Sequence, residues 1–361
     1  MRARDDVTTR PVQVQIPVAV AVAVQVQVAC YRPGVPARVV CSAAMPVDLV
    51  SLLGDGVELD APAPGQARFS PDALRARVAE ADALICLVTD RIDAAFLAAA
   101  PRLRVVANYG VGIDNIDLAA AARRGVAVTN TPDVLTEATA DLAFALLLAA
   151  ARRLGEGERL LRAGRWGGWE PGLLLGVPVA GQTLGIIGMG RIGLAVARRA
   201  SGFAMSVIYA GRGRAVAAAD ALGARQVTLP ELYQAADFVS VHYPLSAETH
   251  HLVDRAALAA MKPTAILINT ARGACVDEDA LAEALAAGRL AGAGLDVYDG
   301  EPAVRAALLA CERVVLAPHL GSATTVARRR MAEICAGAVR AVLDGRRPDT
   351  LIGARGEEGA A

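Results

Sequence analysis

The chain has 361 residues, a length typical of about two domains. It is 54% hydrophobic and 20% charged, which is the composition of a globular protein and excludes a disordered or fibrous chain. The formal net charge is zero and no strong basic stripe is present, which argues against nucleic acid as the main partner.

The cysteines are scattered, with no CxxC pair and no Cys/His cluster: Cys30, Cys41, Cys86, Cys275, Cys311 and Cys335. We therefore expect neither a disulfide framework nor a metal site, and a reducing cytoplasm fits this usage. Because no apolar run reaches transmembrane length, we expect no membrane partner.

The first 36 residues form an unusual extension. Val or Ile occupies every even position from Val12 to Val28. This period of two is typical of a strand, but the run is longer than ordinary strands and Pro17 interrupts it. A secretory signal fits poorly, because Gln recurs within the apolar stretch. We interpret residues 1–36 as a low-complexity extension that is disordered or pairs at a sheet edge.

From residue 37 to about 133, short apolar runs alternate with helical segments. Strands are expected at Arg38–Cys41, Ala83–Val88, Arg104–Ala107 and Val126–Thr129, and helices at Val47–Leu53, Pro71–Ala79, Ala94–Ala99 and Leu118–Arg123. Strands that alternate with helices predict a parallel sheet covered on both faces.

A long helix is predicted next, from Leu135 to Arg153, because its apolar residues recur at helical spacing. Asp133 is its expected N-cap. A loop rich in glycine and tryptophan follows, from Gly164 to Pro171.

The stretch from Thr183 to Arg199 carries the most informative motif. An apolar run ends at Ile187 and is followed at once by the glycines Gly188, Gly190 and Gly193, and then by a helical pattern. A GxGxxG turn between a strand and a helix is typical of dinucleotide binding. We call this segment, Gly188 to Gly193, the fingerprint. The first glycine makes the turn, the second admits the pyrophosphate, and the third allows close packing of helix and strand.

The remaining chain continues the α/β pattern. Strands are expected at Met205–Tyr209, Phe238–His242, Ala265–Asn269, Gly292–Val297 and Val314–Ala317, with helices at Asp279–Ala287 and Ala323–Leu343. The last helix follows all the strands, and we expect it to pack back on the first unit. Residues 348–361 are predicted to be a mobile tail.

Three loops directly after these strands carry candidate catalytic residues: Arg272, Glu301 and His319. Open α/β sheets bind ligands at such strand ends. A reductase of 2-oxo acids needs an anion clamp, a proton donor, and a group that keeps the donor protonated. Taken singly, each residue has an ordinary alternative: a surface ion pair, a solvated acid or a structural histidine. His242, His250 and His251 are expected to be structural or exposed.

From about Ala37 to Leu343 the chain resembles the D-isomer-specific 2-hydroxyacid dehydrogenases, especially the branch of glyoxylate/hydroxypyruvate and 2-ketogluconate reductases. The resemblance lies in YGVGIDNID from Tyr109, NTPDVLTEATADLAFALLL from Asn130, the fingerprint, VHYPLSAETHHLV from Val241, MKPTAILINTARGACVDEDAL from Met261, AGLDVYDGEP and APHLGSAT. These ordered motifs are specific to the family and less specific to the substrate.

The resemblance implies an α/β fold of two Rossmann-like domains with parallel sheets and an active site in the interdomain cleft. It implies a discontinuous substrate-binding domain, residues 37–133 plus 318–347, and a dinucleotide-binding domain, residues 134–317. It also implies a dimer joined through the cofactor domains, for which the helix after Pro132 and the loop of Trp166 and Trp169 are candidate contacts.

The resemblance further implies roles for individual residues. Arg272 would hold the substrate carboxylate and 2-oxo oxygen, His319 would protonate that oxygen, and Glu301 would favour the imidazolium form of His319. The backbone N–H groups of Val111 and Gly112 would also bind the carboxylate. Cofactor contacts carried over by position are Arg191, Ile192, Pro244, Thr249, Thr270, Ala271, Asp296 and Gly321.

The second strand of the dinucleotide unit bears on cofactor choice. NAD enzymes place a carboxylate at its end to bind the ribose 2′-OH. Here Ala210 stands at that place, and Arg212 and Arg214 follow. The 2′-phosphate of NADP(H) would not be repelled by a carboxylate and would be attracted by the two arginines. NADP(H) is therefore predicted to be preferred, and NAD(H) remains an alternative.

Two other functions stay open at this point. The same fold and triad could use NAD on another acid, such as a D-lactate-like or phosphoglycerate substrate. A dinucleotide-sensing protein that resembles transcriptional corepressors is the other alternative, because such relatives can keep the catalytic set.

Overall fold

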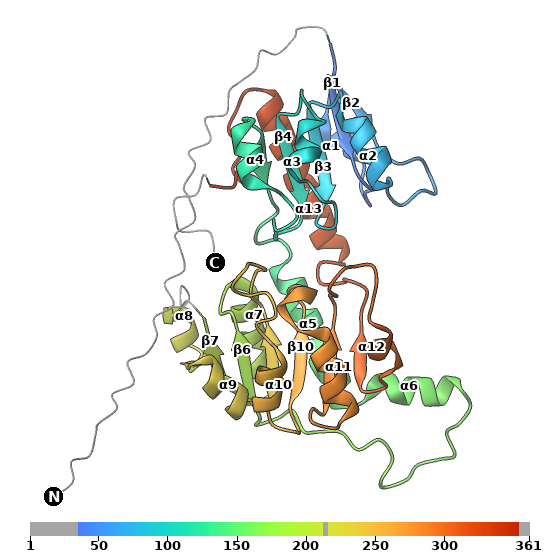
Figure 1. The fold of residues 1–361 in the computed structure, drawn as a ribbon, viewed down its shortest axis with the longest axis vertical. Helices are drawn as coiled ribbons and strands as arrows, with labels where there is room; N and C mark the ends of the chain where they lie inside the picture. The colour runs from blue at the N-terminus through green and yellow to red at the C-terminus, as the bar shows by residue number, and fades with distance from the viewer. Residues whose placement is uncertain (1–34, 212–215, 354–361) are drawn as a thin grey trace, which may run out of the picture.

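The computed structural model describes residues 35–211 and 216–353. The alternating N-terminal stretch lies outside these residues, as do Arg212 and Arg214. The described chain forms two α/β units, each built on one sheet (Figure 1). Every strand pairing within the two sheets is parallel, which confirms the predicted fold class.

The first sheet has the strand order β2-β1-β3-β4-β5. Its strands are β1 (Ala37–Cys41), β2 (Val57–Asp60), β3 (Ala83–Leu87), β4 (Val105–Tyr109) and β5 (Ala127–Thr129). Successive residues of a strand face opposite sides, so Val39 joins one apolar core and Val40 the other. The five helices of this unit, divided between the two faces, are α1 (Leu49–Leu53), α2 (Pro71–Val78), α3 (Ala94–Ala98), α4 (Leu118–Arg123) and α13 (Thr325–Leu343).

The second sheet has the order β12-β11-β10-β9-β6-β7-β8. Its strands are β6 (Thr183–Ile187), β7 (Ser206–Ala210), β8 (Arg225–Gln226), β9 (Phe238–Val241), β10 (Ile266–Asn269), β11 (Gly292–Leu295) and β12 (Val314–Leu316). The order reverses between β6 and β9, and doubly wound sheets bind their ligands at the carboxyl ends of strands at such a point. The predicted fingerprint begins there, directly after β6.

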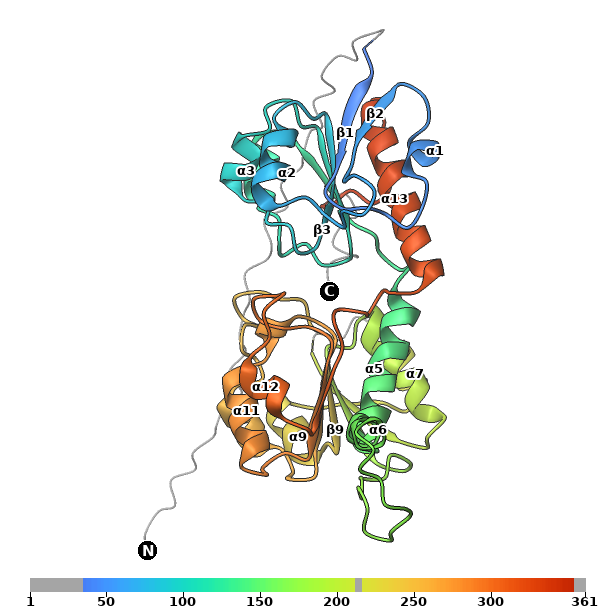
Figure 2. The same cartoon turned by 90° about the vertical axis from the view of Figure 1, so that its right-hand side faces the viewer.

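Helices cover both faces of this sheet (Figures 1 and 2). One face carries α5 (Thr136–Ala151), α7 (Arg191–Ser201) and α8 (Val216–Asp220). The other carries α9 (Leu229–Ala235), α10 (Arg255–Ala260), α11 (Glu278–Ala286) and α12 (Ala306–Ala310). The helix α6 (Leu154–Arg162) and the loop after it extend away from the sheet (Figure 1). A short 3-10 turn, η1 (Gly273–Cys275), follows β10.

Two long helices connect the units (Figure 2). The chain passes from β5 into α5, which packs against β10 and β11, and it returns through α13, which packs against β4. The expected return of the last helix to the first unit is therefore confirmed. The exact domain boundaries, 37–133 plus 318–347 and 134–317, remain predictions.

Two local predictions were wrong, and two strands were not anticipated. The strands β2 and β8 were not expected, because both are short and carry charged or polar residues. The predicted helix 135–153 is divided: α5 ends at Ala151, and Arg153 adopts a left-handed conformation, φ 51°, before α6. Asp133 is not the N-cap of α5; its φ is 72° and it pairs instead with Arg191 at 2.8 Å.

The prediction of a mobile tail from residue 348 is wrong for the first residues of that range. Leu351 is buried and forms a bridge with Thr129, and the amide of Ile352 donates to the carbonyl of Val128 at 2.8 Å. Apolar burial therefore keeps this segment against β5. Residues 354–361 lie outside the described chain. Within residues 35–211 and 216–353, none of the helices has both the length and the apolarity to cross a bilayer.

Candidate functional site

The fingerprint turn joins β6 to α7, and two of its glycines are required by the structure. Gly188 has a φ of 99°, and a Cβ there would lie 2.9 Å from the carbonyl carbon of His242. A Cβ on Gly193 would lie 2.2 Å from the carbonyl oxygen of Gly188. Gly190 caps α7 with a φ of −80°, so no conformational need is seen at that position. The turn therefore has the close backbone packing expected of a dinucleotide site.

The first turn of α7 faces the connection between the units. The Arg191 Nε atom bonds Asp133, which precedes α5, and Ile192 packs against apolar cores of both units. These two predicted cofactor residues thus lie beside the linking segment. Their helix presents its N-terminus, the positive end of the dipole, at the fingerprint turn.

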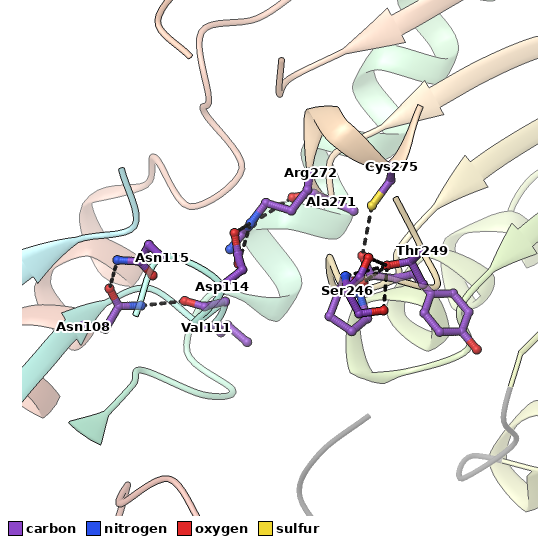
Figure 3. Close-up of polar contacts among 12 residues, drawn as sticks. Asn108, Val111, Asp114, Asn115, Ser246, Thr249, Ala271, Arg272 and Cys275 are labelled. Carbon is purple, nitrogen blue, oxygen red and sulfur yellow. Dashed lines mark hydrogen bonds and ion pairs between the residues drawn. The ribbon is translucent and has the colours of Figure 1, made fainter. Parts of the chain in front are cut away.

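Two predicted cofactor residues organise the loop after β9 (Figure 3). The Thr249 hydroxyl donates to the carbonyl of Pro244 at 2.7 Å and accepts from the amide of Ser246 at 2.7 Å. Thr249 is buried, so its hydroxyl links two backbone groups of the loop on the side that faces the protein interior. Pro244 is the more accessible member of this pair.

At the end of β10, Thr270 is buried and its hydroxyl has no hydrogen-bond partner among the residues described. The next residue, Ala271, donates its amide to Asn269 Oδ1 at 3.0 Å. A buried hydroxyl without a hydrogen-bond partner destabilises the fold unless a ligand or a water molecule supplies that partner. This group therefore suits a polar atom of a bound cofactor.

At the end of β11, Asp296 holds the loop that carries the histidine. Its two carboxylate oxygens accept from the amides of Leu320 and Gly321, at 2.6 and 2.8 Å, and its carbonyl accepts from the amide of His319. Burial raises the pKa of Asp296, and the hydrogen bonds from the two backbone amides oppose that shift. Thr139 of α5 donates to the Gly321 carbonyl at 3.1 Å, which ties the loop to the long helix.

His319 and Glu301 are in direct contact. Nδ1 of His319 lies 2.8 Å from Oε2 of Glu301, and the other carboxylate oxygen accepts from the Tyr298 amide at 3.0 Å. Burial by itself would raise the pKa of Glu301, but the hydrogen bond and charge of His319, with a contribution from Arg272, lower it overall. Glu301 is therefore an ionised acceptor, and Nδ1 of His319 carries the hydrogen between them.

The loop that carries Glu301 has a second anchor. The amide of Asp299 donates to Glu278 Oε1 at 2.7 Å, and burial raises the pKa of Glu278. Glu278 lies at the start of α11, so the position of Glu301 depends on this helix as well as on β11.

Arg272 reaches the other unit (Figure 3). Its Nε atom lies 3.0 and 3.2 Å from the carboxylate oxygens of Asp114, in the loop after β4, and its Nη1 donates to the carbonyl of Ala271 at 2.8 Å. A Cβ on Gly112 would fall 1.6 Å from Nη2 of Arg272. The guanidinium group therefore lies on the glycine of the YGVG loop.

Two asparagines orient this loop. Asn108 donates to the carbonyl of Gly112 at 2.6 Å, and Asn130 donates to the carbonyl of Val111 at 2.9 Å. Both carbonyls thus have a donor, whereas the amides of Val111 and Gly112 have no acceptor within the described part of the chain. Two unpaired N–H groups beside a guanidinium group can bind a carboxylate.

The structure thus brings Glu301 and His319 into contact and places Arg272 against the loop of Val111 and Gly112. Sequence reasoning assigned no role to Asp114, Asn108 or Asn130. Asp114 lies within the YGVGIDNID motif, and the two asparagines lie in or directly after a strand, which was the available signal. Arg212 and Arg214, the predicted contacts of a 2′-phosphate, lie outside the described residues.

Comparison with known proteins gives a consistent family. The NAD binding domain of the D-isomer specific 2-hydroxyacid dehydrogenases matches residues 144–321. A glyoxylate reductase of Thermococcus litoralis is 51% identical over 76% of this chain and 85% of its own length. One from Thermococcus kodakarensis is 47% identical over 87% of this chain and 96% of its own length.

Solved structures agree. The TT0316 protein from Thermus thermophilus has a TM-score of 0.80 and 48% identity, covering 87% of this chain and 99% of that one. An NADPH-dependent glyoxylate/hydroxypyruvate reductase from Sinorhizobium meliloti, in complex with NADP and malonate, has a TM-score of 0.78 and 36% identity, covering 88% and 96%. The chain is a nicotinamide-dinucleotide-dependent oxidoreductase and belongs to the D-isomer-specific 2-hydroxyacid dehydrogenase family.

Proposed function

We propose that the protein reduces small 2-oxo acids, such as glyoxylate and hydroxypyruvate, to D-2-hydroxy acids and prefers NADPH. The contact between His319 and Glu301 is the observation that carries the proposal. It leaves Nε2 of His319 free to give a proton to the substrate, while Glu301 stabilises the charged ring. 2-Ketogluconate is a larger candidate substrate of the same type.

The residues present fit a dinucleotide. Gly188 and Gly193 leave no room for a side chain at the turn, and the buried Thr270 hydroxyl lacks a protein partner among the described residues. Bound there, the nicotinamide would supply the hydride for C2 of the substrate. The cofactor set proposed for this site also includes Gly190, Arg191, Ile192, Pro244, Thr249, Ala271, Asp296 and Gly321.

The protein residues would perform the remaining steps. The amides of Val111 and Gly112 and the guanidinium group of Arg272 bind the carboxylate. Arg272 also polarises the 2-oxo oxygen, where negative charge develops. His319 donates its Nε2 proton to that oxygen, so the product leaves as the 2-hydroxy acid and the ring is left neutral. In the oxidation direction the neutral ring accepts the proton.

NADPH preference is argued from the end of β7. Ala210 pairs with Ile187, the residue before the fingerprint glycine, so the position beside the turn has no carboxylate to bind a ribose 2′-OH. Arg212 and Arg214 follow in the sequence, and the relative from Sinorhizobium meliloti is an NADPH-dependent enzyme bound to NADP.

The decisive experiment is NADPH and NADH oxidation by the purified protein with glyoxylate, hydroxypyruvate, 2-ketogluconate and pyruvate. We expect kcat/KM to be higher for NADPH than for NADH, and to be highest for glyoxylate and hydroxypyruvate. A clear preference for NADH would contradict the argument from Ala210 and Arg212. No turnover with any acid would favour a dinucleotide-sensing role.

We also propose a homodimer in the cytoplasm. The arm formed by α6 and the following loop exposes large apolar side chains, among them Trp169, which is 82% exposed. Its other exposed apolar residues are Leu154, Leu161, Trp166, Leu173 and Leu175. Apolar patches of this kind mark contact surfaces. Light scattering should give the mass of two chains, and Trp169→Ser with Leu175→Ser should shift it toward one.

A further inference from the structure

We propose that Asp114 is a positioning residue that orients Arg272 for the substrate carboxylate. The inference deepens the proposed function and rests on it. Asp114 lies in the loop between β4 and α4, whereas Arg272 follows β10 of the other sheet. The pair therefore joins the two units at the proposed site (Figure 3).

The donors of Arg272 are divided between protein and substrate. A guanidinium group has five N–H donors. Asp114 takes the one on Nε, and the Ala271 carbonyl takes one on Nη1. The three that remain are one on Nη1 and two on Nη2, and Nη2 lies over Gly112. The N–H donors of Arg272 that remain for a ligand thus include those on Nη2, beside the unpaired backbone amide of Gly112.

Asp114 can fix this orientation because its own loop is anchored. The side chain of the next residue, Asn115, donates to the carbonyls of Leu87 and Asp90 at 3.1 and 2.9 Å. On the other side, Asn108 holds the carbonyl of Gly112. The carboxylate of Asp114 therefore projects from a short segment that is held at both ends.

Stability is a weak explanation for this pair. The side chains of Arg272 and Asp114 are 22% and 25% exposed, so water still reaches the pair, and ion pairs that water reaches contribute little to folding stability. Orientation is the stronger explanation, since a misplacement of about 1 Å can lower a rate about 100-fold.

The test uses the full chain with Asp114→Asn, Asp114→Ala and Gly112→Ala. Gly112→Ala would displace Arg272 without changing any charge. For all three we expect kcat/KM for glyoxylate to fall about 10- to 100-fold, least for Asp114→Asn, which keeps one acceptor. The KM for NADPH and the melting temperature should stay unchanged. The control is Glu80→Gln, which breaks an exposed ion pair with Arg38 far from the site.

A double-mutant cycle with Arg272→Lys isolates the mechanism. If Asp114 acts through Arg272, then Asp114→Ala adds no further loss in the Arg272→Lys background. Additive losses would overturn the inference, as would an equal rise in the KM for NADPH.

Binding of oxalate, an unreactive two-carbon carboxylate, separates the inference from the proposed reaction. Calorimetry should show about 10-fold weaker oxalate binding by Asp114→Ala and unchanged binding by Glu80→Gln. This result without glyoxylate reduction would support the inference while the proposed reaction fails. No oxalate binding by the wild type, or equal binding by Asp114→Ala, would overturn the inference.

Discussion

Nδ1 of His319 lies 2.8 Å from Oε2 of Glu301, although the two residues come from loops after different strands. The contact depends on separate supports. Asp296 accepts from the backbone amides of the loop that carries His319. In the loop that carries Glu301, the Tyr298 amide donates to the Glu301 carboxylate, and the Asp299 amide donates to Glu278 of α11. The proposed proton donor and its proposed counter-charge are therefore held together before any substrate binds.

Replacement of the counter-charge should impair turnover more than binding. Glu301→Gln keeps a side chain that can accept from Nδ1 but removes the negative charge that, in the proposed mechanism, stabilises the imidazolium ring. We expect kcat to fall about 100-fold or more, in the range of a lost general-acid contribution. NADPH affinity, measured by fluorescence titration, should not change. A Glu301→Gln enzyme with wild-type kcat would contradict the role of Glu301.

Much of this arrangement was predictable from the sequence because it follows strand ends. Arg272, Glu301 and His319 each lie in a loop after a predicted strand, and parallel strands bring such ends to one edge. Asp114 was not predictable in the same way, because its partner lies 158 residues away in the other unit. The packing of Leu351 against β5 was also missed, because a polar, glycine-rich tail gives no periodic signal.

Gly193 provides a test of the turn that is independent of catalysis. In Gly193→Ala the new Cβ would lie 2.2 Å from the backbone oxygen of Gly188, which cannot move aside like a flexible side chain. We expect a loss of about 1–3 kcal/mol in the free energy of unfolding and weaker NADPH binding. The matched control is Gly337→Ala in α13, where a Cβ meets no neighbour within 4 Å. That variant should gain about 0.5–1 kcal/mol, because alanine favours a helix. Denaturant unfolding of both variants measures the difference.

Asp296 should affect both stability and rate. In Asp296→Asn one of the amides of Leu320 and Gly321 would face an NH₂ group and lose its acceptor. A buried unsatisfied amide costs about 1–3 kcal/mol, so the melting temperature should fall. The kcat should fall as well, because the affected turn carries His319. Asp141→Asn, which removes an exposed partner of Arg199, should change neither. Equal melting temperatures for Asp296→Asn and the wild type would show that the carboxylate does not hold the loop.

His242 should make the stability of the protein depend on pH. Burial lowers the pKa of His242 to about 4, below its ordinary value of 6.5. Between these values the unfolded chain binds more protons than the folded one, so stability falls as the pH drops from about 6.5 to 4, by at most about 3 kcal/mol. His242→Gln removes the titrating ring, and its stability should fall less over this range in urea unfolding at several pH values. Ser240→Ala removes the hydroxyl 2.8 Å from the ring but keeps the imidazole, so it should retain the wild-type pH dependence. The same slope with pH in His242→Gln as in the wild type would assign the effect to other groups.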